Sequence, residues 1–584
     1  MRRIARRLRA TRHDERGVAL LVVIGIGMLM LAIVATGLTV AVSGLKKTDT
    51  DQDWNGALDA AYAGVEEYQS RLATDNSYYT YGNPAAPFSV LTGTKNLTLP
   101  TGAAANPAFG IDAAGTWATV PQSSPIASFR YEIDSSTYSK DGRIRIRSTG
   151  RVGNVTRSIV ADLKQSGFID YLYFTDFEIQ DPDITGEEGC DILHGWEKRG
   201  SNCDPIAFAK SDTISGPLHS NDIIHICGST FKNKVTSAYP TKPYYVNDCS
   251  GTTINFTIAP AYQPVIQIPT TNGEMRKETR NDLPKDVPIP GCLYTGPTDI
   301  TFTSDGKMNV KSPWTIYTNT GTTAANSTNP TYCGTPGETG LGSTSGQTID
   351  IIPSNLIFVQ NVPADSTNPN YPKVTSPKNF TCITTTNPGW TFGTTKYPAT
   401  NEIAPANYGG STTPYGCKNG DLFVKGTFKG AMTAAAENFI YITGDLVYND
   451  ESKDILGLVG QNAVWVWNPM TKSGNTTSPL LGNNRTIEAA MVSVKHTFQV
   501  QNYTLGGTRG NLNVYGSIAQ KYRGTVGTSS GGTINNGYVK KYEYDTRLAY
   551  MAPPKFLSPV SSSYGVTQYA GVPAAFLATG AVAP

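Results

Sequence analysis

An uncharged run at residues 18–45 constrains this 584-residue chain more than any other feature of its sequence. The run reads VALLVVIGIGMLMLAIVATGLTVAVSGL and is followed by two lysines. A membrane core of about 30 Å needs about 20 apolar helical residues, so the run can span a membrane, and it is longer than the apolar part of a cleavable secretory signal. Residues 1–17 hold seven Arg against two acidic residues. This positive flank predicts a cytoplasmic N-terminus and an exported chain from Lys46 onward.

The junction between the basic block and the apolar run indicates a particular kind of membrane segment. It reads Asp-Glu-Arg-Gly-Val-Ala-Leu-Leu, with Gly17 directly before the apolar residues. A short Arg-rich leader that ends in Gly resembles the leader of type IV prepilins, and RGVALLVV resembles the N-terminus of PilX-type minor pilins. The resemblance implies cleavage after Gly17 by a prepilin peptidase, N-methylation of Val18, and assembly with other pilin subunits. A plain signal anchor is the alternative interpretation.

The chain departs from that family at the fifth residue after the implied cleavage site. Most pilins have Glu there, and this chain has Val22, which cannot form a charge-assisted bond with the N-terminal amine of a neighbouring subunit. A head made of residues 74–584 would be about 60 Å across, whereas packed helices lie only about 8–10 Å apart. We therefore expect rare copies at the tip of a filament.

Beyond the apolar run, a helical stripe continues at Trp54, Leu58, Val65, Tyr68 and Leu72, with Ala61 or Tyr62 in between. Spacings of three and four residues predict one helix over residues 18–72, which would be about 82 Å long. A membrane helix followed by a separate surface helix is the alternative.

Alternation of apolar and polar residues then predicts three strands, at residues 129–134, 143–147 and 156–163. Turn-forming clusters separate them, which is typical of a small antiparallel meander. A long helix followed by such a meander resembles a pilin module over residues 18–166.

From residue 168 onward, short apolar segments recur between Gly, Asn and Asp turns, most clearly at residues 421–467. Gly-Asp-Leu appears at Gly420 and again at Gly444, which predicts the coils of a β-solenoid. A β-sandwich is the alternative for this region. The expected fold class is α+β and mainly β.

The sequence thus predicts five segments. They are residues 1–17 as a basic prepilin-type leader, 18–45 as a transmembrane helix, 46–166 as a pilin-like helix and β-meander, 167–420 as a disulfide-bearing β-rich exported domain, and 421–584 as a β-solenoid-like region with a C-terminal segment.

All eight cysteines lie in the middle of the chain, and no two form a C-x-x-C pair. An even count in an exported region favours disulfides over zinc or redox chemistry. Free buried thiols are the alternative. Pairing in sequence order would join Cys190 with Cys203, Cys227 with Cys249, Cys292 with Cys333, and Cys382 with Cys417.

Sequence motifs of catalysis are absent: there is no G-x-S-x-G, H-E-x-x-H, P-loop or nucleotide-binding glycine motif. We expect no enzymatic activity, no catalytic residue and no cofactor. Four acidic residues, Asp176, Glu178, Asp181 and Asp183, are candidate oxygen ligands for Ca²⁺, with a solvated acidic turn as the alternative.

One further turn, His-Ser-Asn-Asp at residues 219–222, has two interpretations. It is either a catalytic patch of a polysaccharide-cleaving solenoid or a turn stabilised by its own side chains.

Charge also limits the function. Beyond the leader the chain has 41 basic and 44 acidic residues, which excludes a basic nucleic-acid-binding body. We expect a protein of the cytoplasmic membrane with an exported C-terminal part, found on the cell surface or in a pilus after processing. Its expected role is a minor or tip subunit of a type IV pilus or related filament that binds a surface, a partner cell or DNA. The alternatives are a single-pass anchored β-helix enzyme acting on polysaccharide and an envelope scaffold outside any filament.

Overall fold

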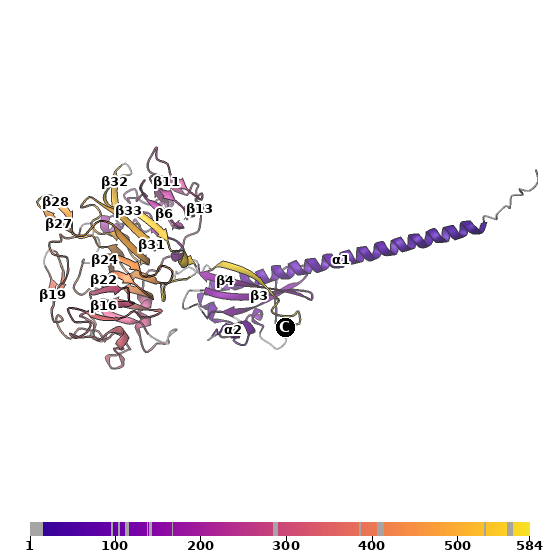
Figure 1. Ribbon diagram of the computed structural model, residues 1–584, viewed down its shortest axis with the longest axis horizontal. Helices are drawn as coiled ribbons and strands as arrows, with labels where there is room; N and C mark the ends of the chain where they lie inside the picture. Colours follow the sequence, from indigo (N-terminus) through magenta and orange to yellow (C-terminus); the bar gives the residue numbers. More distant parts are fainter. Residues whose placement is uncertain are drawn as a thin grey trace, which may run out of the picture.

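The computed structural model describes residues 16–94, 97–102, 105–110, 116–136, 138, 143–165, 167–283, 290–384, 387–405, 414–530, 533–549, 551–557 and 564–584. Three parts follow one another along its longest dimension (Figure 1): a long helix, a small antiparallel sheet and a large β-rich region. Most of the predicted leader, residues 1–15, lies outside the described residues.

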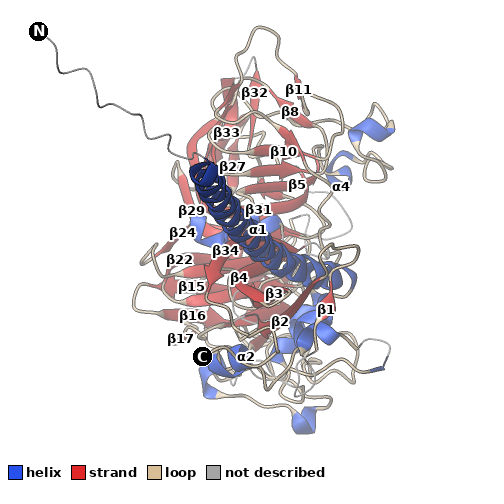
Figure 2. Cartoon of the chain, turned by 90° about the vertical axis from the view of Figure 1, so that its right-hand side faces the viewer, coloured by secondary structure: helices blue, strands red, loops and turns tan. Residues whose placement is uncertain are grey.

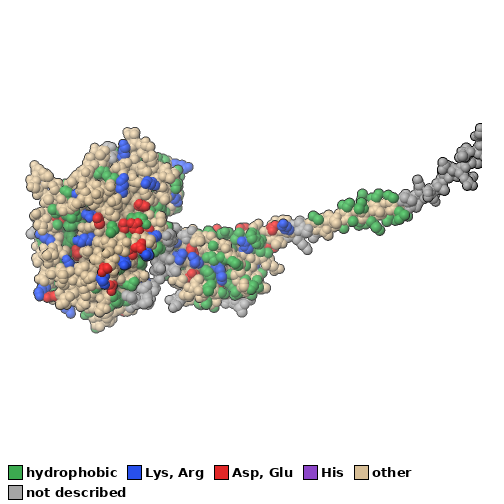
Figure 3. Space-filling view, viewed as in Figure 1, with side chains coloured by type: hydrophobic (Ala, Val, Ile, Leu, Met, Phe, Trp, Pro, Cys, Tyr) green, Lys and Arg blue, Asp and Glu red, His purple; other side chains and the backbone are tan. Residues whose placement is uncertain are grey.

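Helix α1 (Arg16–Thr74) runs through 59 residues without a break. The prediction of one continuous helix is therefore confirmed, and the alternative of two separate helices is wrong. Within it, Leu20–Ala41 is apolar and long enough to cross a membrane. None of that segment is buried, and its side chains form the apolar stretch of the rod in Figure 3.

The second half of α1 is buried against the small sheet. Ala57, Ala61, Val65, Tyr68 and Leu72 are each 0% exposed, and most of them belong to the stripe predicted from the sequence. Because α1 carries four consecutive turns of apolar side chains here, it can cover a sheet along one face. Figure 2 shows the helix lying across the strands that it covers.

Five strands form the small sheet, and every neighbouring pair is antiparallel. In spatial order they are β1 (Ala118–Thr119), β2 (Ala127–Asp134), β3 (Arg143–Val152), β4 (Val155–Gln165) and β34 (Tyr564–Val572). Strands β2, β3 and β4 confirm the predicted meander. Strand β34, from the far end of the chain, was not predicted in this sheet. We call α1 from residue 57 onward together with these five strands the head sheet.

The position of β34 means that residues 166–563 are inserted between two neighbouring strands of the head sheet. Ala161 of β4 pairs with Tyr569 of β34, and Leu163 pairs with Val566. The large β-rich region is therefore connected to the head sheet by two chain segments, one leaving β4 and one entering β34.

Short helical segments interrupt the loops. They are η1 (Asn76–Thr80), α2 (Pro87–Leu91), η3 (Pro107–Phe109), η4 (Phe168–Asp170), α4 (Pro182–Thr185), η5 (Gly195–Glu197), η6 (Gly273–Thr279), η7 (Ala324–Asn326), η8 (Thr331–Cys333) and η9 (Thr546–Ala549).

The large region is built on parallel pairing. Its first ladder has ten strands, each parallel to the next. They are β14 (Cys292–Thr295), β18 (Asn355–Gln360), β23 (Ala431–Ala436), β25 (Ile455–Gly460), β29 (Arg485–Ser493), β31 (Thr508–Tyr522), β5 (Tyr173–Phe177), β7 (Leu218–Ser220), β10 (Val235–Ser237) and β13 (Ala261–Tyr262).

Two more parallel ladders lie beside the first. One contains β15 (Thr298–Thr303), β22 (Leu422–Phe428), β24 (Phe439–Tyr448), β26 (Ala463–Val466) and β30 (Phe498–Val500). The other extends from β31 through β33 (Thr533–Tyr544), β6 (Thr213–Ser215), β9 (Thr230–Phe231) and β12 (Asn255–Phe256).

The remaining strands lie outside the three ladders. They are β8 (Ile224–Ile226) with β11 (Tyr245–Asn247), β16 (Lys307–Lys311) with β17 (Gln347–Asp350), β19 (Phe380–Ile383) with β20 (Gly389–Phe392) and β21 (Thr395–Tyr397), β27 (Met470–Ser473) with β28 (Thr476–Pro479), and β32 (Gly527–Ser530) on β33.

Aligned apolar side chains fill the interior of the first ladder. One column contains Cys292, Ile357, Ala434, Leu458, Met491, Ile518, Tyr173, Leu218 and Val235, each paired with the next. All are at most 2% exposed. Such stacking explains why these strands are nearly continuous apolar runs, as is typical of parallel sheets buried on both faces.

These observations confirm a mainly β chain with a long apolar helix and an antiparallel sheet. Gly420 and Gly444 are not partners, because β22 pairs with β24 at Leu422 and Ile440. A 24-residue offset does occur elsewhere, where Ala431 pairs with Ile455. Parallel pairing disfavours a β-sandwich, whose sheets are antiparallel. The β-solenoid stays a prediction.

Candidate ligand-binding groove

Polar side chains gather where four consecutive strands of the first ladder end. Asn361 follows β18, Asn438 closely follows β23, Asn462 closely follows β25, and Lys495 closely follows β29. Because these strands are aligned in parallel, their turns stack at one corner of the large region, between the first and second ladders. The Asn462 amide donates to the Asn438 side-chain oxygen, and the Asn462 main-chain N–H donates to the Asn438 carbonyl oxygen at 3.0 Å.

This corner borders an open cavity of about 860 Å³. Most of its lining is made of Asn, Gln and Thr side chains and of three cations. The only aromatic residue in the lining is Phe358, which is 1% exposed. A volume of this size is within the range of about 300–1,000 Å³ found for small-ligand sites. We call this cavity the corner groove.

One wall of the corner groove is the segment at residues 270–273, which crosses the ends of the strands. Asn272 fixes it: its N–H donates to Gln461 Oε1 at 2.6 Å, and its side-chain amide donates to the Ala436 carbonyl oxygen at 2.8 Å. Gln461 Nε2 in turn donates to the Thr270 carbonyl oxygen at 3.1 Å. Asn272 is 1% exposed, so the wall is held by buried hydrogen bonds and is pre-formed.

The charges of the corner groove are unbalanced. Arg276, Lys418 and Lys495 line it, against the single carboxylate of Glu437. Glu437 is already engaged, since its Oε2 accepts from the Asn361 N–H at 2.7 Å. Burial lowers the pKa of the half-buried Arg276, and the nearby Glu437 opposes that shift. Within the described part of the chain, neither Lys418 nor Lys495 forms an ion pair, and both are exposed.

A buried carboxyl lies behind the corner groove. Asp421 is 0% exposed, and its Oδ1 accepts from Asn438 Nδ2 at 2.6 Å and from the Phe439 N–H at 3.1 Å. Burial raises the pKa of Asp421 to about 7. The side chain of Asn438 is therefore oriented by a group that changes charge near neutral pH.

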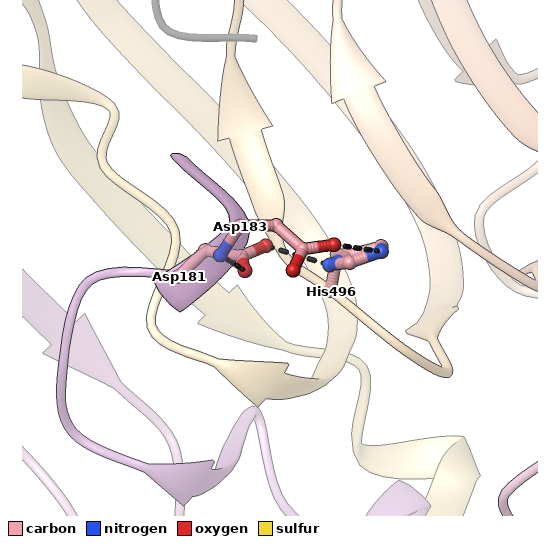
Figure 4. Close-up of side chains that lie close together, drawn as sticks. All are labelled: Asp181, Asp183 and His496. Atoms are coloured by element: carbon pink, nitrogen blue, oxygen red, sulfur yellow. Dashed lines mark hydrogen bonds and ion pairs between the residues drawn. The ribbon is translucent and has the colours of Figure 1, made fainter. Parts of the chain in front are cut away.

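The four acidic residues proposed for Ca²⁺ divide between different partners. Asp181 Oδ2 lies 2.8 Å from His496 Nδ1, and Asp183 Oδ2 lies 3.6 Å from His496 Nε2 (Figure 4). Glu178, in contrast, pairs with Arg523 where both side chains are 0% exposed.

Asp176 makes a third set of contacts. It accepts from the Asn221 amide at 2.9 Å and lies 3.5 Å from His194. The four carboxylates thus do not converge on one point in the structure, and Asp181 and Glu178 are buried rather than solvated.

The polar side chains of the turn at residues 219–222 form hydrogen bonds and an ion pair with neighbouring residues. His219 is 0% exposed, with Nε2 3.0 Å from Asn221 Oδ1 and Nδ1 3.0 Å from Thr236 Oγ1. Burial lowers the pKa of His219 to about 4, so the ring is neutral at pH 7. Asp222 forms an ion pair with Arg199. These contacts are those of a turn held by its own side chains and close neighbours.

The cysteines form four disulfides, Cys190–Cys203, Cys227–Cys249, Cys292–Cys333 and Cys382–Cys417. These are the same pairs that pairing in sequence order gives. Gly17 and Val18 lie in the first turn of α1, and their processing stays a prediction.

The corner groove was missed from the sequence. Its residues come from six segments that lie between about 20 and 80 positions apart along the chain, and apart from residues 270–276 no short segment contains more than two of them. A signal was present, however, because an amide or charged residue directly follows several of the apolar segments, as in Glu437-Asn438, Gln461-Asn462 and Lys495-His496.

No protein-family model matches the sequence, and no curated protein matches it. Among solved structures, the chain is similar to the competence-associated pilin ComZ from Thermus thermophilus. The match covers 89% of this chain and 97% of ComZ, with 11% sequence identity and a TM-score of 0.27.

Proposed function

We propose that the protein is a pilin-like surface subunit that is inserted in the membrane through α1 and carries a large ligand-binding region outside the cell. The observation that supports this proposal most strongly is the difference in burial between the two halves of α1. Its first half, Leu20–Ala41, is apolar and wholly exposed, whereas its second half is buried against the head sheet. Exposed apolar surface of this extent needs a lipid bilayer or a bundle of similar helices to cover it.

We also propose that the chain is cleaved at the start of α1. Cleavage after Gly17 by a prepilin peptidase would remove the basic leader and leave Val18 as the methylated N-terminus. The apolar segment would then pass from the membrane into a filament of other pilin subunits. Before cleavage, the seven arginines of residues 1–17 hold the leader on the cytoplasmic side.

A tip position is the placement that we propose within the filament. Val22 is 52% exposed on α1 and offers no carboxylate to a neighbouring amine. The large region is broader than the spacing between packed helices, so copies at consecutive positions would collide. Both constraints are relaxed at a tip, where the subunit has fewer neighbours.

We propose the five-segment division predicted from the sequence, with residues 564–572 joining the head sheet and with segments 167–420 and 421–584 sharing the first ladder. The parallel ladders support a β-solenoid, because each strand buries the apolar face of the next. The four disulfides support an oxidising, exported location. Binding to a surface, a partner cell or DNA is the proposed role, and no catalytic step is proposed.

N-terminal mass spectrometry of sheared surface filaments tests the proposal. The expected mature chain begins at Val18, and Gly17→Phe should abolish both cleavage and recovery in filaments. Gly482→Phe is the matched control, because Gly482 lies outside α1 and a side chain there meets nothing within 4 Å. Recovery of chains that begin at Met1 from filaments would contradict the proposal.

The same experiment, together with an activity assay on the purified protein, separates the alternatives. An uncleaved chain that stays in the membrane fraction would indicate an envelope scaffold. Release of oligosaccharides from polysaccharide by the purified protein would indicate an anchored enzyme.

A further inference from the structure

We propose that the corner groove binds an acidic polysaccharide, with the sugar chain running along the ladder across the turns that follow β18, β23, β25 and β29. This inference rests on the proposed function, because it names the class of ligand that the exported region would bind. Three properties of the groove carry it: the spacing of its amides, the excess of positive charge, and the absence of an exposed aromatic face among its lining residues.

The spacing of the polar side chains suits a polymer of sugars. Neighbouring strands of a sheet lie about 4.8 Å apart, which is close to the length of one pyranose residue in a chain. Asn361, Asn438, Asn462 and Lys495 lie in the turns after four consecutive strands of the ladder. Asn438 is 4% exposed and its amide is bonded to Asp421 and Asn462, whereas Asn361 and Lys495 are exposed and Asn462 is half-buried. Three of the four turns therefore offer a polar side chain to a sugar residue, and an amide can both donate to and accept from hydroxyl groups.

The charge of the groove selects an acidic sugar over a neutral one. Lys418 and Lys495 have no ion-pair partner within the described residues, and Glu437 is occupied by the Asn361 N–H. Arg276 is half-buried, with Glu437 as a nearby carboxylate. A ligand carboxylate at this position would make charge-assisted hydrogen bonds, which are stronger than bonds between neutral groups.

The lining argues against nucleic acid as the ligand. Single strands are held by bases stacked on aromatic side chains, and Phe358, the one aromatic residue of the lining, is 1% exposed. Double-stranded DNA requires a broad basic surface, whereas the chain beyond the leader has slightly more acidic than basic residues.

The test is a binding measurement on the full-length chain in lauryldimethylamine oxide, a detergent without a sugar headgroup. The probes are polygalacturonate, neutral dextran, and single-stranded and double-stranded DNA. We expect saturable binding of polygalacturonate that weakens as salt is added, and no binding of dextran. Lys418→Ser with Lys495→Ser should weaken polygalacturonate binding at least about tenfold, because two charge-assisted contacts are lost.

Lys429→Ser with Lys472→Ser is the matched control. Both lysines are exposed and outside the groove, and the net charge changes equally. The control pair should leave the affinity for polygalacturonate unchanged. Asn272→Ala gives a second measurement, since it should loosen the wall at residues 270–273 and weaken binding while both lysines remain.

Three results would overturn the inference: no polygalacturonate binding by the unaltered chain, equal losses in the two lysine pairs, or tighter binding of either DNA with loss in the groove pair. Failure here is distinguishable from failure of the proposed function. A chain that is cleaved at Gly17 and recovered in filaments but does not bind polygalacturonate would support the proposed function and contradict the inference about the groove. A chain that binds polygalacturonate but is never cleaved would support the inference about the groove and contradict the proposed function.

Discussion

The head sheet and the large ladder region are both β structures, yet they are held together in opposite ways. In the ladder region, partners are near in sequence for most steps, as where Ala431 pairs with Ile455 and Phe439 pairs with Ala463. In the head sheet, Gln69 of α1 donates to the Tyr564 carbonyl oxygen, and the Arg151 guanidinium donates to the Ala578 carbonyl oxygen at 2.9 Å. The head sheet thus depends on contacts between the two ends of the chain.

This difference predicts different responses to damage. A ladder of stacked strands resembles a repeat protein, in which stability is a sum of local terms. The head sheet is a single cooperative unit that needs α1, the meander and β34 together. A change in one region should therefore leave the other region folded.

The largest effect is expected for Gly150→Val in the head sheet. A Cβ atom at Gly150 would lie 2.0 Å from the Ala57 carbonyl oxygen and 2.3 Å from the Ala61 nitrogen, so α1 must move off the sheet. We expect a loss above about 4 kcal/mol of unfolding free energy in the head sheet. Amide hydrogen exchange of the full chain should show lost protection in β2–β4 and unchanged protection in the ladders.

Gly571→Val is the control for that experiment, because a Cβ atom at Gly571 meets nothing within 4 Å. Equal protection of the head sheet in the two variants would contradict the close contact between α1 and β3.

The next effect concerns the point within the ladder region where β5, from its N-terminal part, pairs with β31, from its C-terminal part. Arg523 directly follows β31, and Glu178 directly follows β5; their ion pair is buried on both sides. Arg523→Met leaves Glu178 without its charge partner and should destabilise this part by about 3–5 kcal/mol. The measurement is hydrogen exchange in β5 and β31.

Lys521→Met is the matched variant of the same chain segment. Lys521 pairs with Asp191 at 3.2 Å near the surface, so its loss should cost less than about 1 kcal/mol. Similar losses from Arg523→Met and Lys521→Met would show that the buried pair does not join β5 to β31.

A third effect tests whether the ladder region relies on covalent links that the described head sheet lacks. Removal of Cys382–Cys417 by a double Ser variant should cost about 2–4 kcal/mol. Removal of Cys190–Cys203, which closes a shorter loop, should cost about 1 kcal/mol less. Urea unfolding followed by tryptophan fluorescence measures both.

Thiol labelling of the denatured, unreduced protein is the accompanying check. Few of the eight cysteines should react, and labelling of six or more would refute the disulfide framework.

The smallest effect is a dependence on pH that belongs to the ladder region. The pKa of Asp421 is about 7 in the fold, above the value of about 4 in an unfolded chain. Between these values the folded chain holds a proton that the unfolded chain has released. The stability contributed by Asp421 is therefore complete below pH 4 and is lost as pH rises through 7.

Asp421→Asn removes this titration while keeping an oxygen that accepts from Asn438. Between pH 5 and pH 7, the variant should lose about 2 kcal/mol less unfolding free energy than the unaltered chain. Equal pH profiles from urea unfolding would contradict a protonated Asp421 at this corner of the ladder.

Local periodicity was enough to predict α1, β2, β3 and β4, because each carries its own pattern of apolar residues. Strand β34 was not predictable in the same way. Its sequence, Tyr-Gly-Val-Thr-Gln-Tyr-Ala-Gly-Val, has two glycines and no clean alternation, and its partner β4 lies about 400 residues earlier. The apolar runs at residues 421–467 indicated buried strands but not which strand pairs with which.

The corner groove escaped prediction for a related reason. Arg276 and Lys495 are separated by more than 200 residues and meet only because η6 lies across the ends of the ladder strands. Pairing of distant strands is set by packing of the whole chain, whereas the cysteine pairs follow sequence order because each links a loop to nearby chain.

The insertion of residues 166–563 between β4 and β34 also sets an order of events during synthesis. Because synthesis begins at the N-terminus, α1 and strands β2 to β4 exist before β34 does. Until β34 has been made, β4 has an open hydrogen-bonding edge, which can pair with other chains. A chain that ends before residue 564 therefore leaves the sheet on which α1 packs one strand short.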